Sequence, residues 1–308
     1  MKNITTKILR IVLSLSFLSF LSLDAYAGSY LPWRLGYKSI KVDNKNVDIR
    51  IGYLIANENV PFKGNVLYYQ GLGDSMLNHD PLFEVLTNAG YRVVAFDYMG
   101  QGGSAGSMDD TRISNINEIG DQVIRLLGRK NGPDGSKYHI LGWSTGGLAA
   151  YRKAFYDTGA SIKSIIMLAP GIAPNYFVGE GIWSWPILEI SMRTLTNNKF
   201  IGVNDPHHDP IHPKSPLEVI SFALNLQATA KAMRAVGFIS SSIKGLTLLS
   251  GPGDTYVNAP KTKKVLRSKA SHFKIKEYPM GLHELDNETE DIAIDVRDSI
   301  LNFLNSQY

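Results

Sequence analysis

The residue pattern best suited to chemistry surrounds Ser144, in the run Gly142-Trp143-Ser144-Thr145-Gly146-Gly147. A strand-like apolar run at 138–141 comes directly before it, and a helix-like run at 148–154 follows it. The glycines two residues to either side of Ser144 leave room for a sharp, strained turn, which would expose its hydroxyl at the carboxyl end of a strand and beside a helix N-terminus. This context predicts a nucleophile elbow with Ser144 as the nucleophile.

Ser144 needs partners, because a serine hydroxyl is a weak nucleophile until a base removes its proton. Asp254 lies in a turn after an apolar run, and His283 lies in a loop between the last strand-like and the last helix-like run. Loops at the carboxyl ends of strands are where α/β sheets build their sites. We therefore predict that Ser144, Asp254 and His283 act as nucleophile, orienting carboxylate and general base.

Each partner also has a plainer interpretation. Asp254 could cap a helix or form a turn, and His283 could be a surface histidine. His272 is a rival base, but it starts a strand-like run instead of following one. We expect His272 at the opposite end of the sheet from Ser144.

An oxyanion formed during acyl transfer needs hydrogen-bond donors. The loop after the strand-like run 65–69 reads Gln70-Gly71-Leu72-Gly73-Asp74-Ser75. We expect the backbone N–H groups of Leu72 and Thr145 to be the donors. The same glycines would also suit a plain tight turn, and the sequence does not separate the two interpretations.

The elements that must hold these residues alternate between strand and helix, which predicts a mostly parallel sheet with helices on both faces. Two N-terminal strands, 37–42 and 47–55, flank the turn-like 43–46 and should form an antiparallel hairpin. Further strands are predicted at 65–69, 91–96, 138–141, 162–168, 246–250 and 273–278. Amphipathic helices are predicted at 113–127, with Ile116, Ile119, Val123 and Leu127 on one face, and at 292–304, with Ile294, Ile300 and Phe303.

The segment from Gly171 to about Phe238 interrupts this alternation and is interpreted as a helical cap inserted into the sheet order. Trp183 and Trp185 stand close together in it, where they would either line a substrate pocket or complete the core. With the cap as an insertion, residues 28–308 form one α/β domain.

Several motifs, in their order and spacing, make the chain similar to a known family. They are Gly71-Leu72-Gly73-Asp74, the run Phe96-Asp97-Tyr98-Met99-Gly100-Gln101-Gly102-Gly103-Ser104, the elbow at Ser144, Asp254, and Gly281-Leu282-His283-Glu284. Over about residues 37–305 the chain resembles the monoacylglycerol lipase and lysophospholipase branch of the α/β-hydrolases, often labelled serine aminopeptidase-like. It departs at two positions, because that family usually has His-Gly where Gln70-Gly71 stands and a further histidine in place of Ser75.

The resemblance implies an α/β-hydrolase fold, with an eight-stranded sheet and a cap after the sixth strand. It also implies that no cofactor is used and that the substrate is an ester with one long acyl chain, such as a monoacylglycerol or a lysophospholipid. We therefore expect a serine ester hydrolase, whose cap could make transient contact with a membrane surface.

Two other classes of function stay open. A serine aminopeptidase would need an acidic cluster for the amine of its substrate, and the carboxylates of the cap are Glu180, Glu189, Asp205, Asp209 and Glu218. A ligand-binding protein on a hydrolase fold is the non-enzymatic alternative, although a binding protein would have no need of Ser144, Asp254 and His283 together.

The first 27 residues are typical of a secretory signal peptide. Lys2, Lys7 and Arg10 form a basic flank, Ile11–Leu23 carries no charge, and Ala25-Tyr26-Ala27 ends the segment. The uncharged run is shorter than the ~20 residues that a bilayer span needs. We expect cleavage after Ala27 and export to the periplasm or the external medium.

The composition fits a folded chain without nucleic-acid partners. Of 308 residues, 44% are hydrophobic and 19% charged, so disorder is not expected. Residues 1–27 contain three basic residues and one acidic residue, so removing them lowers the net charge from +4 to +2. No basic cluster is interleaved with aromatic residues, which argues against nucleic acid. The chain has no cysteine, which excludes a disulfide and a lipoprotein anchor.

Two patterns imitate other enzyme families. Gly73–Met76 with 202–205 and 209–212 imitates the blocks of GDSL hydrolases, with Ser75 as nucleophile, but the last two blocks lie almost end to end here. The loop Gly100–Ala105 imitates a dinucleotide-binding turn, but its third glycine is replaced by alanine. The acidic residue that such a turn needs about 20 residues on would be Glu118 or Asp121, inside a predicted helix instead of at a strand end, so we expect neither family.

A third pattern imitates a metal site. His207, His208, Asp209 and His212 carry groups that zinc could bind. The prolines among them deny the segment a regular helix that would present these side chains together, so we expect no metal site.

Overall fold

The computed structural model describes residues 29–129, 137–175, 198 and 216–308. Their strands form one sheet in the order β1-β2-β4-β3-β5-β6-β7-β8. The strands are β1 (Arg34–Val42), β2 (Lys45–Leu54), β3 (Gly64–Tyr69), β4 (Tyr91–Phe96), β5 (Tyr138–Trp143), β6 (Ile162–Leu168), β7 (Lys244–Leu249) and β8 (Lys274–Glu277). Only β1–β2 and β2–β4 pair antiparallel, so the eight-stranded, mostly parallel sheet is confirmed.

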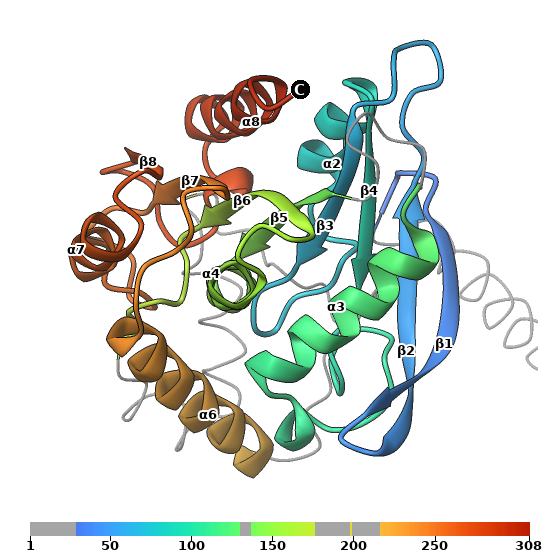
Figure 1. The fold of residues 1–308 in the computed structure, drawn as a ribbon, viewed down its shortest axis with the longest axis horizontal. Helices are drawn as coiled ribbons and strands as arrows, with labels where there is room; N and C mark the ends of the chain where they lie inside the picture. The colour runs from blue at the N-terminus through green and yellow to red at the C-terminus, as the bar shows by residue number, and fades with distance from the viewer. Residues whose placement is uncertain (1–28, 130–136, 176–197, 199–215) are drawn as a thin grey trace, which may run out of the picture.

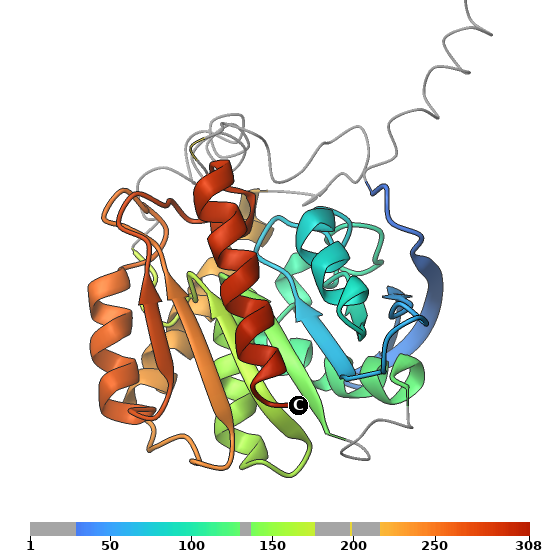
Figure 2. The same cartoon turned by 90° about the horizontal axis from the view of Figure 1, so that it is seen from above.

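Helices cover both faces of this sheet, as the β/α alternation predicts (Figure 1). They are α2 (Asp80–Asn88), α3 (Ile113–Leu127), α4 (Thr145–Asp157), α6 (Pro216–Ala235), α7 (Ala259–Lys269) and α8 (Glu290–Asn305), with short 3-10 turns η1 (Met108–Asp110) and η2 (Leu285–Asn287). Residues of α2 and α8 share one core cluster, and residues of α3, α4, α6 and α7 share another. Figure 2 looks onto the face that α8 crosses. None of the helices in the described ranges has the length and apolar character to cross a bilayer.

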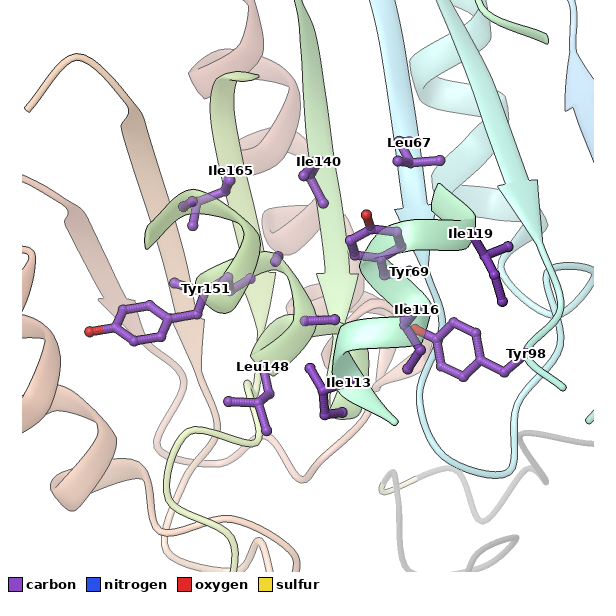
Figure 3. Close-up of a cluster of buried hydrophobic side chains, with 14 of the residues drawn as sticks. Leu67, Tyr69, Tyr98, Ile113, Ile116, Ile119, Ile140, Leu148, Tyr151 and Ile165 are labelled. Carbon is purple, nitrogen blue, oxygen red and sulfur yellow. The ribbon is translucent and has the colours of Figure 1, made fainter. Parts of the chain in front are cut away.

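The packing of α3 follows its apolar stripe. Ile116, Ile119 and Val123 are buried against the sheet, and Leu127 is partly buried at the end of the helix. Figure 3 shows Ile113 of α3 beside Leu148 of α4, and Ile116 of α3 near Tyr98. Burying each aliphatic side chain contributes about 1.5–3 kcal/mol. The amphipathic face predicted for α3 is therefore the one that packs.

The stripe predicted for the last helix was wrong at one position. Ile294 is 45% exposed, whereas Ala293, Val296, Ile300 and Phe303 are buried. Those four residues lie three or four positions apart, which places them on one side of a helix. Ile294 is six positions from Ile300 and so faces solvent.

The hairpin that begins the sheet is tighter than the sequence predicts. β2 starts at Lys45, so only Asp43 and Asn44 form the loop, with φ of 45° and 64°. Aspartate and asparagine tolerate this left-handed region better than most residues, and it is the geometry of a two-residue hairpin turn.

The parallel strands bring several loops to one edge of the sheet. The loops that follow β3, β5, β7 and β8 all leave from carboxyl ends, and β3, β5, β6 and β7 are neighbours in the sheet. This edge is where the residues proposed from the sequence meet.

Candidate active site

Ser144 occupies a strained turn between β5 and α4. Its φ is 53° and its ψ is −112°, a conformation that residues with a side chain rarely adopt. Two glycines make the turn sterically possible: a Cβ on Gly142 would lie 2.3 Å from the carbonyl oxygen of Gly146, and one on Gly146 would lie 2.0 Å from that of Tyr69. The backbone around Ser144 is therefore closely packed, and a side chain at position 142 or 146 would collide with main-chain atoms.

The structure brings the three predicted side chains together. His283 Nε2 lies 2.7 Å from Ser144 Oγ, and His283 Nδ1 lies 2.9 Å from Asp254 Oδ2. His283 and Asp254 are buried, whereas Ser144 is partly exposed. Each imidazole nitrogen thus has one partner, and the hydroxyl stands at the accessible end of the relay.

Asp254 is held as a carboxylate. Its Oδ2 also accepts a hydrogen bond from the Ser250 hydroxyl at 2.5 Å, and its Oδ1 accepts from the N–H groups of Tyr256 and Val257 at 2.8 and 3.1 Å. Burial by itself would raise the pKa of Asp254, but His283 and these hydrogen bonds outweigh burial and lower the pKa below its ordinary value. An ionised Asp254 requires the proton of neutral His283 to sit on Nδ1, which leaves Nε2 free to accept one from Ser144.

The imidazole is also fixed by packing. The Trp143 indole N–H donates to the His283 carbonyl oxygen at 2.9 Å, and the ring of Tyr256 lies 4.8 Å from the imidazole ring. The rival base His272 lies far along the sheet, at the amino ends of β7 and β8, where its Nε2 is 3.0 Å from the Ile243 carbonyl oxygen. His272 is therefore not brought to Ser144, as predicted.

The predicted oxyanion donors lie on two adjoining segments. Thr145 is the first residue of α4, so its N–H has no acceptor within the helix. In the loop after β3, the Gly71 and Gly73 N–H groups donate to Asp74 Oδ2 and Gln101 Oε1, at 3.4 and 3.0 Å. Leu72, between them, has no hydrogen-bond acceptor for its N–H among the described residues. That arrangement leaves the Leu72 N–H available to a ligand.

The two sites at which the chain departs from the resembling family have partners of their own. Gln70 is buried, and its side-chain amide donates to the Asp74 carbonyl oxygen at 2.7 Å. Ser75 is buried as well, and its Oγ accepts from the Arg50 guanidinium at 3.1 Å. A buried serine at an arginine has no access to substrate, so Ser75 is not placed as the GDSL-like pattern would require.

The dinucleotide-like loop Gly100–Ala105 packs against Asp97, the residue that follows β4. A Cβ on Gly102 would lie 2.5 Å from Asp97 Cγ, and the Gly103 N–H donates to Asp97 Oδ2 at 3.0 Å. The glycines thus allow the backbone to approach Asp97, which also pairs with Arg50. This is a structural role that supports the neighbouring loop at Met76, whose N–H donates to Asp97 Oδ1 at 3.1 Å.

Several predictions concern residues outside the described ranges. These are the signal peptide at 1–27, the tryptophans Trp183 and Trp185, the GDSL-like blocks at 202–212, the histidines His207, His208 and His212, and the cap carboxylates Glu180, Glu189, Asp205 and Asp209. For Glu218 the backbone of α6 is described but not the side chain. Of the remaining cap, Asn198 donates to Glu288 through both its backbone and its side chain, and its side-chain amide also donates to the Met280 carbonyl oxygen.

Sequence reasoning missed a buried charged cluster next to the site. His79 lies between Asp74 and Asp286, with Nε2 2.8 Å from Asp74 Oδ2 and Nδ1 2.5 Å from Asp286 Oδ2. Glu284, which follows His283 directly, is also buried, and burial raises its pKa to about 7. The only sequence signal was a pair of carboxylates close after His283, and nothing in it pointed to His79.

Comparison with known proteins identifies the family. A family model described as serine aminopeptidase, S33, matches residues 61–290. The putative carbamate hydrolase RutD of Variovorax paradoxus is 30% identical over 110 residues, which covers 36% of this chain and 39% of that protein.

Solved structures share the fold. The monoacylglycerol lipase of Paleococcus ferrophilus has a TM-score of 0.64 at 20% identity and covers 84% of this chain and 99% of its own. A soluble variant of the monoglyceride lipase from Saccharomyces cerevisiae has a TM-score of 0.69 at 17% identity. This match covers 92% of this chain and 97% of the lipase. Identities this low show the fold and not the substrate. With three quarters of its length matched by the family model, the chain belongs to the serine aminopeptidase S33 family of α/β-hydrolases.

Proposed function

We propose that this hydrolase cleaves carboxylic esters through an acyl-enzyme intermediate on Ser144. The observation that carries the proposal is the relay itself, in which His283 Nε2 lies 2.7 Å from Ser144 Oγ while Asp254 holds Nδ1. A binding protein would gain nothing from a serine strained to φ 53° and aligned with a buried imidazole and carboxylate.

In the proposed first step, Ser144 Oγ attacks the ester carbonyl carbon while its proton passes to His283 Nε2. The carbonyl oxygen becomes an oxyanion, which the N–H groups of Leu72 and Thr145 stabilise. The C–O bond to the alcohol then breaks, and His283 returns the proton to the leaving alcohol, so that Ser144 carries the acyl group.

In the second step, a water molecule attacks the acyl carbon while His283 takes its proton. The bond to Ser144 Oγ breaks, the serine regains the proton from His283, and a carboxylic acid leaves. Asp254 stays ionised throughout and stabilises the imidazolium that forms twice in each turnover.

We further propose that the ester carries one long acyl chain, as in a monoacylglycerol or a lysophospholipid. Support comes from the sequence resemblance and from structural neighbours named as monoacylglycerol and monoglyceride lipases. In this proposal Trp183 and Trp185 line the acyl pocket, the cap touches a membrane surface, and the protein is exported to the periplasm or the medium.

An aminopeptidase, the activity in the family's description, would need a free carboxylate to bind the substrate's amine. Three carboxylates near His283 are already committed. Glu284 and Asp286 are buried in the His79 cluster, and buried Glu288 accepts the N–H groups of Leu282 and Thr289 at 2.8 and 3.0 Å. The described part of the site thus favours an ester.

Two assays test these proposals. An alkyl fluorophosphonate should label wild-type protein at Ser144, and Ser144→Ala should abolish the labelling. On p-nitrophenyl esters of graded length, each added carbon should raise kcat/KM up to about fourfold until the pocket is full, since burying a methylene is worth ~0.8 kcal/mol. Faster cleavage of aminoacyl nitroanilides would reverse the choice between esterase and peptidase, and a preference for acetyl esters would refute the lipid substrate.

A further inference from the structure

His79 lies where the segments of the candidate site meet, yet no step of the proposed reaction uses it. It is 1% exposed and precedes α2 as its N-cap. Carboxylates only accept hydrogen bonds, so the imidazole can bond to Asp74 and Asp286 together only with a proton on each nitrogen. His79 is therefore an imidazolium between two carboxylates.

Asp74 connects this imidazolium to the oxyanion loop, which is the loop Gln70–Ser75 after β3. The same Oδ2 that faces His79 accepts the Gly71 N–H at 3.4 Å and the Tyr68 hydroxyl at 3.2 Å. Leu72, whose N–H is the proposed donor, lies between Gly71 and Asp74 in the chain. The Asp74 carboxylate thus holds both ends of the segment that orients the Leu72 N–H.

Asp286 connects the imidazolium to the loop of His283. It lies three residues after His283, and the neighbouring Asn287 side chain donates to Glu284 Oε1 at 2.6 Å and to the Asn78 carbonyl oxygen at 3.3 Å. The hydrogen bond from Asn287 to Asn78 is therefore a second connection between the same two segments, beside the contact of Asp286 with His79.

Trp143 adds the nucleophile elbow to the same junction. It directly precedes Ser144, and its ring centroid lies 5.6 Å from that of His79. Its indole N–H donates to the His283 carbonyl oxygen at 2.9 Å. The oxyanion loop, the elbow and the His283 loop are thus all in contact around one imidazolium.

The charge on His79 is costly to place and depends on both carboxylates. It is buried, and it lies at the N-terminus of α2, where the helix dipole disfavours a cation. Burial alone would lower the pKa of His79, but the charges and hydrogen bonds of Asp286 and Asp74 raise it well above its ordinary value. The other titratable groups that interact with it are Tyr68, Asp80 and Glu284. Losing one member of such a cluster leaves a buried charge without its full counter-charge.

We propose that His79 is a positioning residue, whose imidazolium fixes the oxyanion loop against the loop of His283 and so sets the Leu72 N–H and the general base at the correct separation around Ser144. This inference rests on the proposed function, since it assigns His79 a role in that reaction. It differs from a purely structural role because displacing reacting groups by about 1 Å costs roughly a hundredfold in rate without a matching loss of binding.

The test compares His79→Gln, Asp286→Asn and their double variant with Leu86→Ala. Leu86 is a buried residue of α2, the helix that His79 precedes, and it lies in the core cluster that contains Trp143. Measurements are kcat and KM on p-nitrophenyl butyrate, the rate of Ser144 phosphonylation and the melting temperature. We expect kcat and phosphonylation to fall about tenfold to a hundredfold in His79→Gln, with KM changed less than threefold. Asp286→Asn should act in the same direction, and the double variant should lose no more than the worse single variant, because both changes break one connection.

Two further readouts separate positioning from stability. Leu86→Ala should lower the melting temperature with kcat unchanged. The wild-type kcat should fall at alkaline pH as His79 loses its proton, and His79→Gln should lack that decline. If His79→Gln does not fold, Asp286→Asn decides, since it keeps the His79 contact with Asp74.

Other outcomes overturn the inference. A kcat within threefold of wild type in both single variants, despite lower melting temperatures, would make the cluster merely structural. If the losses of kcat in the two single variants simply added in the double variant, His79 and Asp286 would act independently and not through one connection. Failure of the wild-type protein to react at Ser144 would refute the proposed function and the inference together, whereas normal labelling of the wild type and unchanged variants would refute the inference alone.

Discussion

Replacing Gly146 by alanine should abolish most activity, because the nucleophile elbow and the end of β3 are in backbone contact there. The new Cβ would lie 2.0 Å from the Tyr69 carbonyl oxygen and 2.7 Å from that of Gln70. Ordinary contact begins near 3.4 Å, so the two segments must separate by about 1.4 Å. Neither contact can be relieved by a side-chain rotation, since both involve main-chain oxygens.

The separation acts directly on the proposed oxyanion site. Gln70 begins the loop that carries Leu72, and Gly146 follows Thr145, so the displacement changes the spacing of the two donor N–H groups. A misplacement of about 1 Å costs roughly a hundredfold in rate, and overpacking typically costs about 1–3 kcal/mol of stability. We therefore expect Gly146→Ala to lose at least about a hundredfold in kcat/KM while a folded fraction remains.

The assay is kcat/KM on p-nitrophenyl butyrate at 20 °C, with the folded fraction taken from circular dichroism and a thermal melt. Gly36→Ala is the matched control, because a Cβ at that position in β1 meets nothing within 4 Å. It should keep full activity. A Gly146→Ala protein that is folded and within threefold of wild-type kcat/KM would refute the reasoning.

Four other results are expected. Ser144→Ala should lose on the order of a million-fold in turnover while Ser75→Ala keeps most of it, and the reverse would move the nucleophile to Ser75. Asp254→Asn should lose about 10⁴-fold, because an amide favours the wrong imidazole tautomer, and a tenfold loss would contradict the relay. Glu284 has a folded pKa of about 7 against an ordinary 4.5, so the folded state holds its proton between these values and stability should fall as pH rises through that window. Urea unfolding at pH 5 and 7.5 should show a smaller fall in the free energy of unfolding for Glu284→Gln than for wild type. An equal fall in both proteins would refute the role of Glu284 in this pH dependence. N-terminal sequencing of exported protein should begin at Gly28, and retention of Met1 would refute the signal peptide.

Sequence alone predicts the elements whose signals are local. The strands Tyr91–Phe96 and Ile162–Leu168 and the helix Ile113–Leu127 begin and end where the sequence predicts, because each is bounded by residues that break the pattern. The elbow is found for the same reason, since its glycines, strand and helix are contiguous. Ile294 shows the limit, because the sequence of a helix with apolar residues on several sides does not determine which side packs.

The meeting of Ser144, Asp254 and His283 was predictable from topology and not from any contact signal. Parallel strands place their following loops on one edge, so residues 139 positions apart can be expected to meet there. The sequence gives no reason, however, for the distances between those loops. In the structure one of these distances is limited by the main-chain contact of Gly146 with Tyr69, which involves no recognisable motif beyond the glycine itself.

The His79 cluster lay beyond sequence reasoning for a related reason. His79 and Asp286 are 207 positions apart and neither belongs to a motif, so only the fold pairs them. Once they are paired, the departure at Gln70 becomes intelligible, because its amide donates to the carbonyl of the same Asp74 whose carboxylate receives His79. Asp74 therefore fixes the loop that carries Leu72 in two ways, through its main-chain carbonyl bonded to Gln70 and through its carboxylate bonded to His79. A site read from its three reacting residues would omit the buried charges that keep the loops carrying them at a fixed separation.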